Sequence, residues 1–412
     1  MDATHENMAL RATKFRIMSW LMRQDWEPVD EFYRDLVKGH AKLSEVNENL
    51  KDVAAPCVSA RWEEIANCGL GNHRTSVRLD LDEDSQLSQT TKEALQLDAE
   101  KNNYVNQEKH TSDHILKHVK KRDERHTYRV TLAYNGAAFK GYMRQPDSKT
   151  VQGTLEDAIT PHMQDGKSAF VPSAGRTDKG VHAAATVISF TSWKDIPDDT
   201  MRDAIHASSQ GDIRVHTVER VPRKFHATFS ALWRRYVYLL PLDPQVWSTS
   251  SIENHLLHAV NRLLAPLRNR ELDYYAFARD TPKSKDCVCK FQTAHAFLGV
   301  LPRTNGARVL CVELVGNRFL RRQIRVFMAT LVLQALRILE VRGQLPNNAI
   351  PMADTTTDTC SSDAGINECG GAFPEPADES VLMYTVMQSD RDLTAWPAPA
   401  NGLCFAGVGY PS

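Results

Sequence analysis

Apolar and polar residues alternate along several stretches of the chain, as they do in β-strands that are buried on one face. The clearest case is Thr127–Tyr134, and the Asn135 and Gly136 pair directly after it is typical of a turn. Comparable apolar or alternating runs predict further strands over Ala183–Phe190, Ile213–Val218, Arg234–Leu240, Lys290–Leu298 and Arg308–Val315.

A second spacing, of three to four residues between apolar positions, predicts helices. It is clearest over Leu320–Leu339, and helices are also expected at Val151–His162, near 198–206 and at Ile252–Leu264. Because helices and strands are mixed and consecutive strands are mostly joined by short links, we expect an α+β fold with a largely antiparallel sheet and helices packed on the outside. The theme of strand, helix, strand, strand occurs twice, which favours two similar halves, residues 116–220 and 221–345.

Three segments depart from this pattern. Residues 1–115 are polar, with an acidic run at 80–84, and we interpret them as an extension with some local order. Residues 346–393 are acidic and rich in Pro, Thr, Ser and Gly, a composition that cannot form its own core, so we interpret them as a disordered insertion. Apolar residues return at 394–412, which predicts a final strand that docks on the main sheet.

The net charge of −1 hides an uneven distribution along the chain. Residues 346–412 contain nine Asp and Glu and one basic residue, and residues 1–115 contain 14 Lys and Arg against 21 Asp and Glu. The middle, 116–345, therefore carries +14. A strongly basic middle is typical of a protein that binds a polyanion such as RNA. A solvated surface of Lys and Arg explains the charge equally well.

Other function classes find little support. No segment runs long enough without charge to span a bilayer, so a membrane protein is not expected. The eight cysteines are scattered, with Cys287 and Cys289 as the one close pair, so we expect no zinc site and reduced thiols in an intracellular protein. Residues 8–24 are basic and free of acids, as in a mitochondrial transit peptide, but an ordinary surface helix explains them as well. The compartment, mitochondrial or cytoplasmic and nuclear, stays open.

One short segment, Ser173–His182, combines a carboxylate, two cations and two glycines, which are residue types found in catalytic loops. Gly175 and Gly180 permit a tight backbone, and an apolar strand follows at once, so Asp178 is expected on a short, well-anchored loop. Arg176 and Lys179 flank it with positive charge, which favours an ionised carboxylate that can act as nucleophile or base. Alternatively, Asp178 and Arg176 simply cap a turn, which is the commoner role for a lone Asp in such a loop.

The stretch from Ala174 to Ala183, Ala-Gly-Arg-Thr-Asp-Lys-Gly-Val-His-Ala, resembles the active-site motif of the TruA-type tRNA pseudouridine synthases nearly residue for residue. Further stretches resemble the family in the same order along the chain, namely 134–142 with 150–156, 225–231 with 235–238, 316–325 and 398–410. The resemblance spans 127–345 and 394–411. It implies the pseudouridine synthase fold, with two similar halves whose sheets join across a basic cleft that has Asp178 at its floor.

The resemblance also implies roles for single residues. Asp178 would be the essential carboxylate when the N-glycosidic bond of uridine breaks and ribose rejoins at C5. Tyr236 would pack against the target uracil and assist removal of the C5 proton, although a tyrosine in such a strand is often just a core aromatic. Arg325 would pair with Asp178 and keep it ionised, unless it belongs to a solvated basic stripe on its helix. The residues expected to bind RNA are Arg176, Lys179, His182, Arg235, Arg321 and Arg322.

The implied reaction is an isomerisation that neither oxidises its substrate nor transfers an external group, so no cofactor and no metal are expected. The implied partner is RNA, with tRNA as the first choice and ribosomal RNA as the second, bound by a homodimer or within a ribonucleoprotein particle. Three departures from the family pattern keep a rival open: Asn135 replaces Asp, Thr186 replaces Gln, and Thr228 replaces Arg. That rival is an RNA-binding assembly factor that keeps the fold without the catalysis.

Overall fold

The computed structural model describes residues 14–50, 125–163, 167–247, 249–345 and 380–411. All of these residues belong to one compact unit. Within these ranges, none of the helices is both long and apolar enough to cross a membrane. Most of the predicted extension, residues 51–115, and the acidic part of the predicted insertion, residues 346–379, lie outside the described residues.

The core of the molecule is an eight-stranded sheet with the order β3-β1-β2-β8-β4-β7-β6-β5. Its strands are β1 (His126–Tyr134), β2 (His182–Ser192), β3 (Ile213–Val221), β4 (Trp233–Pro241), β5 (Glu271–Asp273), β6 (Val288–Val300), β7 (Arg308–Gly316) and β8 (Leu403–Gly409). All neighbouring strands are antiparallel except β2 and β8. The predicted α+β class is confirmed, and every strand expected from the apolar pattern is present.

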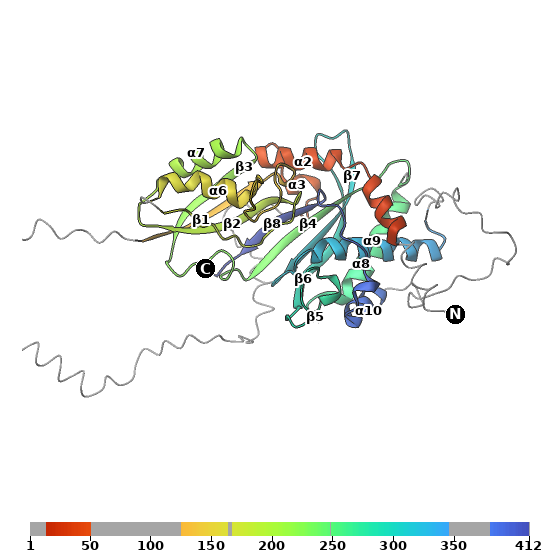
Figure 1. The fold of residues 1–412 in the computed structure, drawn as a ribbon. Coiled ribbons are helices and arrows are strands. Elements are labelled where there is room, and N and C mark those ends of the chain that lie inside the picture. The colour runs from red at the N-terminus through yellow and green to blue at the C-terminus, as the bar shows by residue number, and fades with distance from the viewer. Residues whose placement is uncertain (1–13, 51–124, 164–166, 248, 346–379, 412) are drawn as a thin grey trace, which may run out of the picture. The chain divides into compact units, whose positions relative to one another are not determined.

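Four longer helices pack on one face of this sheet and share a core with it. They are α6 (Val151–Ile159), α7 (Asp198–Ser209), α8 (Ser250–Leu264) and α9 (Gln323–Val341). Figure 1 shows α6 and α7 beside β1–β3, and α8 and α9 beside β4–β7. Short 3-10 helices connect the longer elements: η3 (Gly136–Ala138), η4 (Thr160–His162), η5 (Ala265–Leu267), η6 (Tyr275–Phe277) and η7 (Arg391–Leu393).

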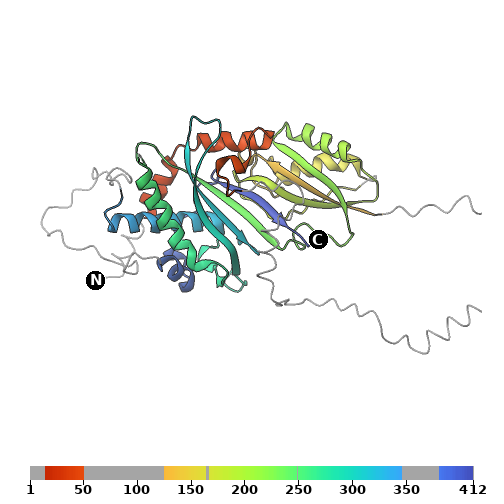
Figure 2. The same cartoon turned by 180° about the vertical axis from the view of Figure 1, so that it is seen from behind.

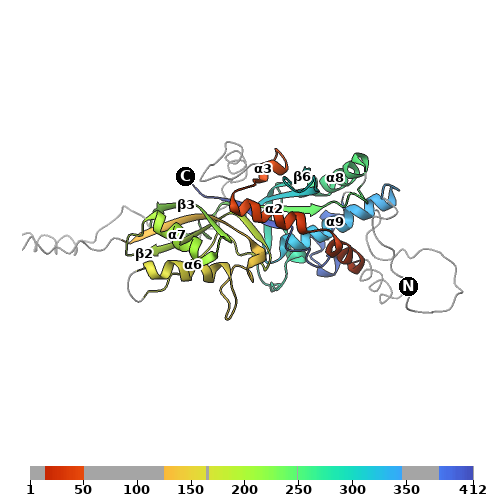
Figure 3. The ribbon, with the colours of Figure 1, turned by 90° about the horizontal axis from the view of Figure 1, so that it is seen from above.

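The opposite face of the sheet is covered by the N-terminal segment. Helix α2 (Glu27–Lys38) and the short helix α3 (Leu43–Val46) bury their apolar residues in a second core with alternate residues of β4, β7 and β8. Figure 3 shows α2, in red, lying over the middle of the sheet. Residues 1–115 were interpreted as an extension with some local order, and for residues 27–46 this order consists of two helices docked on the sheet. One apolar stripe on a largely polar helix was enough to dock it.

A further helix, α10 (Val381–Gln388), lies within the segment predicted to be a disordered insertion. Val381, Leu382 and Val386 follow helical spacing and are buried in the core shared with α8 and α9. That prediction is therefore wrong for residues 381–388, because a single apolar helix face anchors the segment.

The two antiparallel groups of strands join where β2 runs parallel to β8. The pairing is short, with His182 opposite Cys404 and Ala183 opposite Phe405. Figure 2 shows β8, in blue, at the centre of the sheet. The predicted docking of a final strand is confirmed, and its place is central. Because β2 begins directly after the Asp178 loop, this join fixes the position of that loop.

Candidate active site

The loop that carries Asp178 is anchored on both sides by hydrogen bonds to neighbouring elements. Before it, the Ala174 N–H donates to the carbonyl of Val187 on β2 over 2.8 Å. Within it, the hydroxyls of Thr177 and Tyr134 lie 2.6 Å apart, and the Thr177 carbonyl accepts a bond from the backbone of Tyr142. Because hydrogen bonds anchor the loop at several points, the carboxylate of Asp178 is held in one defined position, as a pre-organised site requires.

Two glycines make this loop geometry feasible. Gly180 has a φ of +83°, a left-handed conformation that side chains disfavour. Gly175 has a neighbour on its bare side: a Cβ there would lie 2.7 Å from the Phe405 ring and 3.2 Å from the hydroxyl of Tyr236. The absence of a side chain at 175 therefore lets the loop approach β4 and β8 closely.

Arg325 lies beside Asp178. Its Nη1 is 3.4 Å from Asp178 Oδ2, and its Nε donates to the carbonyl of Ala398 over 2.7 Å. The two side chains are 19% and 28% exposed, so the pair is shielded but remains reachable from solvent. Arg325 sits in the first turn of α9, and Ala398 lies in the segment before β8. The guanidinium thus connects three separate parts of the chain at the carboxylate.

Tyr236 extends from β4 into the same region. Its ring is buried and meets Phe319 and Phe405 edge-on, with ring centroids 5.0 and 4.9 Å away. A β-bulge between Arg235 and Tyr236 shifts their register against β8 at this point, and bulges are often used to re-aim side chains beside sites. Burial raises the pKa of Tyr236 well above that of an ordinary tyrosine, and the negative charge of Asp178 adds to this against the opposing effect of Arg234. The phenol therefore keeps its proton at neutral pH.

The structure thus brings the three residues predicted to be catalytic together from three elements. Two of the predicted RNA-binding residues, Arg176 and Lys179, are exposed on the same loop as Asp178. Arg321 and Arg322 lie before α9, where both pair with Asp280 at the surface, at 3.3 and 3.8 Å. The basic cleft expected at this place stays a prediction.

Two other predicted RNA-binding residues point away from the site. His182 is buried against α2: its ring stacks on Tyr33, with centroids 4.4 Å apart, and its Nδ1 accepts a hydrogen bond from the backbone of Gly136. Arg235 is fully buried with Glu313, Nε to Oε1 2.7 Å. Neither side chain has a surface that could contact RNA. The prediction is wrong in this respect because both residues face the side of the sheet that the N-terminal segment covers.

Sequence reasoning missed Arg234, the neighbour of Arg235 and on the face of β4 that carries Tyr236. Its guanidinium donates to three separate stretches of backbone: from Nε to Ala174 O over 3.1 Å, from Nη2 to Thr228 O over 2.7 Å, and from Nη1 to Asn317 O over 2.8 Å. Thr228 in turn donates from its hydroxyl to Ser173 O. The period of two along β4 placed Arg234 with Tyr236 and could have identified it.

No group of three or more His, Cys, Asp and Glu side chains within the described ranges is placed to hold a metal ion. The expectation that the reaction uses no metal or cofactor stays a prediction.

Several known proteins are similar to this chain in sequence. A family model described as tRNA pseudouridine synthase matches residues 130–230, which include the Asp178 loop. The tRNA pseudouridine synthase A of Chlorobaculum tepidum is 31% identical over 211 residues, which cover 50% of this chain and 81% of that protein. The chain belongs to the tRNA pseudouridine synthase family. Another member, from Latilactobacillus sakei subsp. sakei, is 31% identical over 223 residues, 50% of this chain and 82% of the relative.

A third family member, from Lacticaseibacillus casei, is more similar over a shorter stretch. It is 45% identical over 111 residues, which are 27% of this chain and 44% of that protein. The chain thus spans less than half of this relative but about four fifths of the other two. The family resemblance expected from the motifs is confirmed. A crystal structure of an unknown protein from Galdieria sulphuraria is 13% identical over 53% of this chain and 95% of that one, at a TM-score of 0.16, and adds nothing to this assignment.

Proposed function

We propose that this protein isomerises uridine to pseudouridine in tRNA. The observation that carries the proposal is the carboxylate of Asp178, held on an anchored loop 3.4 Å from the Arg325 guanidinium and beside the buried Tyr236. The names of the curated relatives support tRNA as the substrate class.

The chemistry balances without any other reactant. The bond between N1 of uracil and C1′ of ribose breaks, the base turns, and a bond forms between C5 and C1′. C5 then loses its proton and N1 gains one, so the product has the same atoms as the substrate. A base that reacts in this way must leave its stack, which costs roughly a few kcal/mol. The exposed Arg176 on the same loop is placed to hold such a flipped nucleotide by its phosphate.

The three central residues divide the work. Asp178 supplies the carboxylate that promotes cleavage of the glycosidic bond, and Arg325 fixes its position and compensates its charge. Tyr236 packs its ring against the uracil. Because burial keeps its phenol protonated at neutral pH, Tyr236 is suited to donating a hydrogen bond and poorly suited to acting as a free phenolate base.

The proposal is tested with Asp178→Asn, which keeps the shape of the side chain and removes its charge. The assay uses tRNA labelled with tritium at C5 of uridine, because each turnover releases that label to water. We expect the Asn variant to release none while it binds tRNA nearly as well as the wild type. Full activity of the Asn variant would show that Asp178 is not the catalytic carboxylate.

The rival function, an RNA-binding assembly factor, predicts a different pattern in the same assay. Such a factor would bind RNA but release no tritium from any uridine, with or without Asp178. The rival rests on the departures from the family pattern at Asn135, Thr186 and Thr228. The paired Asp178 and Arg325 favour the enzyme, because an assembly factor needs neither of them.

Three finer expectations also stay proposals. The first is a homodimer or a ribonucleoprotein particle, which sedimentation of the purified protein with and without tRNA would distinguish. The second is ribosomal RNA as the substrate, which mapping of pseudouridine in total RNA with and without the protein would detect. The third is an intracellular location, mitochondrial or cytoplasmic and nuclear, which is supported by buried free thiols such as Cys311 and Cys404 and is tested by fractionation.

A further inference from the structure

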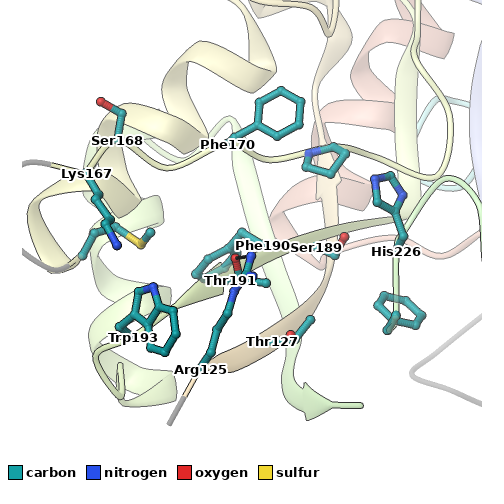
Figure 4. A pocket seen from close by; sticks show the side chains of 13 residues that line it. Arg125, Thr127, Lys167, Ser168, Phe170, Ser189, Phe190, Thr191, Trp193 and His226 are labelled. Carbon is teal, nitrogen blue, oxygen red and sulfur yellow. Dashed lines mark hydrogen bonds between the residues drawn. The ribbon is translucent and has the colours of Figure 1, made fainter. Parts of the chain in front are cut away.

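A pocket of about 600 Å³ opens beside the segment that leads into the Asp178 loop (Figure 4). Its walls come from β2, from the residues that precede the loop, and from the turn between β2 and α7. Two exposed aromatic side chains, Phe170 and Trp193, and two cations, Arg125 and Lys167, border it. None of the described residues that line it is acidic.

Phe170 is an exposed ring on a rigid backbone. It is 68% exposed, whereas the residues on either side are buried. The Ala169 N–H donates to the hydroxyl of Thr160, and the Tyr142 hydroxyl donates to the carbonyl of Val171 over 2.7 Å. This anchoring leaves Phe170 outside the core. A phenyl group held in water by a fixed backbone contributes little to folding, and at the border of this pocket its face is open to a ligand.

Trp193 is presented in a similar way. It is 39% exposed, and the turn that carries it is closed by the hydroxyl of Ser192, which accepts a bond from the Lys194 N–H and donates to the Lys194 carbonyl. The ammonium of Lys167 lies 5.6 Å from the centre of the Trp193 ring. Arg125 also borders the pocket and donates to the Thr191 hydroxyl over 2.8 Å. Figure 4 shows Lys167, Trp193 and Arg125 along the same side of the pocket.

The pocket is connected to the active site by a short, ordered stretch of chain. Pro172 accepts a bond from the Ser189 N–H, and Ser173 pairs with Ile188, so residues 172–174 run along β2 from the pocket toward the join with β8. Asp178 lies six positions after Pro172. Even fully extended, this stretch spans at most about 20 Å, so a ligand in the pocket lies within a few nucleotides of a base at Asp178.

Resting on the function proposed above, we propose that this pocket binds an unpaired nucleotide of the substrate RNA that neighbours the target uridine. Aromatic faces stack on bases of any identity, and cations at their edges meet the phosphates. The two cations at the rim disfavour an apolar or basic protein segment as the occupant, and the two exposed aromatic rings favour stacked bases over an acidic peptide. The nucleotide in the pocket would hold the RNA strand while the target base turns into the site.

The first test changes the stacking residues. In Phe170→Ala/Trp193→Ala we expect KM for tRNA to rise about tenfold, with kcat and the thermal midpoint unchanged. The matched control is Phe15→Ala, because Phe15 is 66% exposed in the helical stretch at residues 14–23 and lies outside the pocket. Lys167→Ala should weaken RNA binding and reduce the slope of log affinity against log salt by about one. Its control is Lys38→Ala on the exposed end of α2, which should leave that slope unchanged.

The second test locates the RNA directly. tRNA with 4-thiouridine at single positions around the target uridine is cross-linked to the wild type, and we expect cross-links in the peptides that contain Phe170 or Trp193. Unchanged tRNA affinity and KM in the double variant would overturn the proposal. Cross-links that avoid both peptides would also overturn it. So would a double variant that binds tRNA normally but no longer binds a protein that the wild type binds. Filter binding of tRNA needs no turnover, so the pocket is tested even if Asp178 proves not to be catalytic.

Discussion

The Nε of Arg234 donates to the carbonyl of Ala174, four residues before Asp178, over 3.1 Å. The same guanidinium also holds backbone carbonyls at Thr228 and Asn317. One side chain on β4 therefore ties the Asp178 loop to the turn before β4 and to the segment that leads into α9. Arg234 acts through the positions of these segments, so we regard it as a positioning residue.

Replacement of Arg234 by Lys should therefore affect both stability and turnover. One ammonium cannot span three carbonyls in different directions, so at least one buried acceptor loses its donor, at a cost of about 1–3 kcal/mol in the free energy of unfolding. We expect kcat to fall several-fold while the affinity for tRNA changes little. Urea unfolding and single-turnover assays measure the two effects. Arg223→Lys, at an exposed position before β4, is the control and should change neither.

The pair of Arg325 and Asp178 leads to a second prediction. Arg325→Lys keeps the charge, but a single ammonium cannot contact both the Asp178 carboxylate and the Ala398 carbonyl as the guanidinium does. We expect the rate of isomerisation to fall at least tenfold, with tRNA affinity almost unchanged. Arg321→Lys and Arg322→Lys are matched controls, because both arginines pair with Asp280 at the surface. If all three variants lose the same activity, the special role of Arg325 is refuted.

A third prediction concerns the buried pair of Arg235 and Glu313. Removal of one partner leaves an uncompensated buried charge, so Arg235→Met should lower the free energy of unfolding by about 3–5 kcal/mol. The double variant Arg235→Met/Glu313→Leu should recover much of that loss. Chemical denaturation of the two single variants and the double variant forms the complete cycle. Any folded variant should bind tRNA like the wild type, and a selective loss of binding would restore the original RNA-binding assignment of Arg235.

A fourth prediction follows from the burial of His182. Burial lowers the pKa of His182, and Asp30 opposes that shift only in part. An unfolded chain takes up a proton at an ordinary pKa of about 6.5, while His182 in the folded protein takes it up only at a lower pH. The free energy of unfolding should therefore fall as the pH drops from 7 to 5, with a contribution of up to about 1.4 kcal/mol per pH unit from His182.

The measurement compares the pH dependence of urea unfolding in the wild type and in His182→Asn. Asn keeps an acceptor near the Gly136 N–H but cannot titrate, so the slope between pH 5 and 7 should become shallower. A residual slope is expected, since burial also lowers the pKa of His216 and of His226. His206→Asn, at an exposed position on α7, should leave the slope as it is. A slope that is unchanged in His182→Asn would contradict the prediction.

The parts of the fold that depend on local pattern were accessible from the sequence. The alternation of apolar and polar residues along Thr127–Tyr134 correctly predicted strand β1. The helical spacing of apolar residues over Leu320–Leu339 correctly predicted helix α9. The glycines of the loop from Ser173 to His182 and the strand after it drew attention to Asp178, but only the resemblance of Ala174–Ala183 to the family motif singled it out from an ordinary turn. The resemblance in residues 316–325 added Arg325, which no local pattern connects to Asp178.

The errors arose where a residue's role depends on distant partners. The sequence shows that Arg234 and Arg235 point to opposite faces of a strand, but the side that carries the site is set by β8 and by the covering helix α2. His182 was misjudged for the same reason, because Tyr33 buries it from a segment that appeared too polar to pack. Helix α10 was missed because its apolar positions are few and follow a run of acidic residues, so the whole segment was interpreted as disordered.

The central place of β8 also sets an order of events during synthesis. Asp178, Tyr236 and Arg325 are all translated before β8, yet Gly175 is packed against Phe405, and Arg325 is bonded to the carbonyl of Ala398. The two groups of strands cannot close around the Asp178 carboxylate until that segment has left the ribosome. A chain interrupted before residue 398 would carry all three residues that are proposed to act on uridine and still be unable to align them.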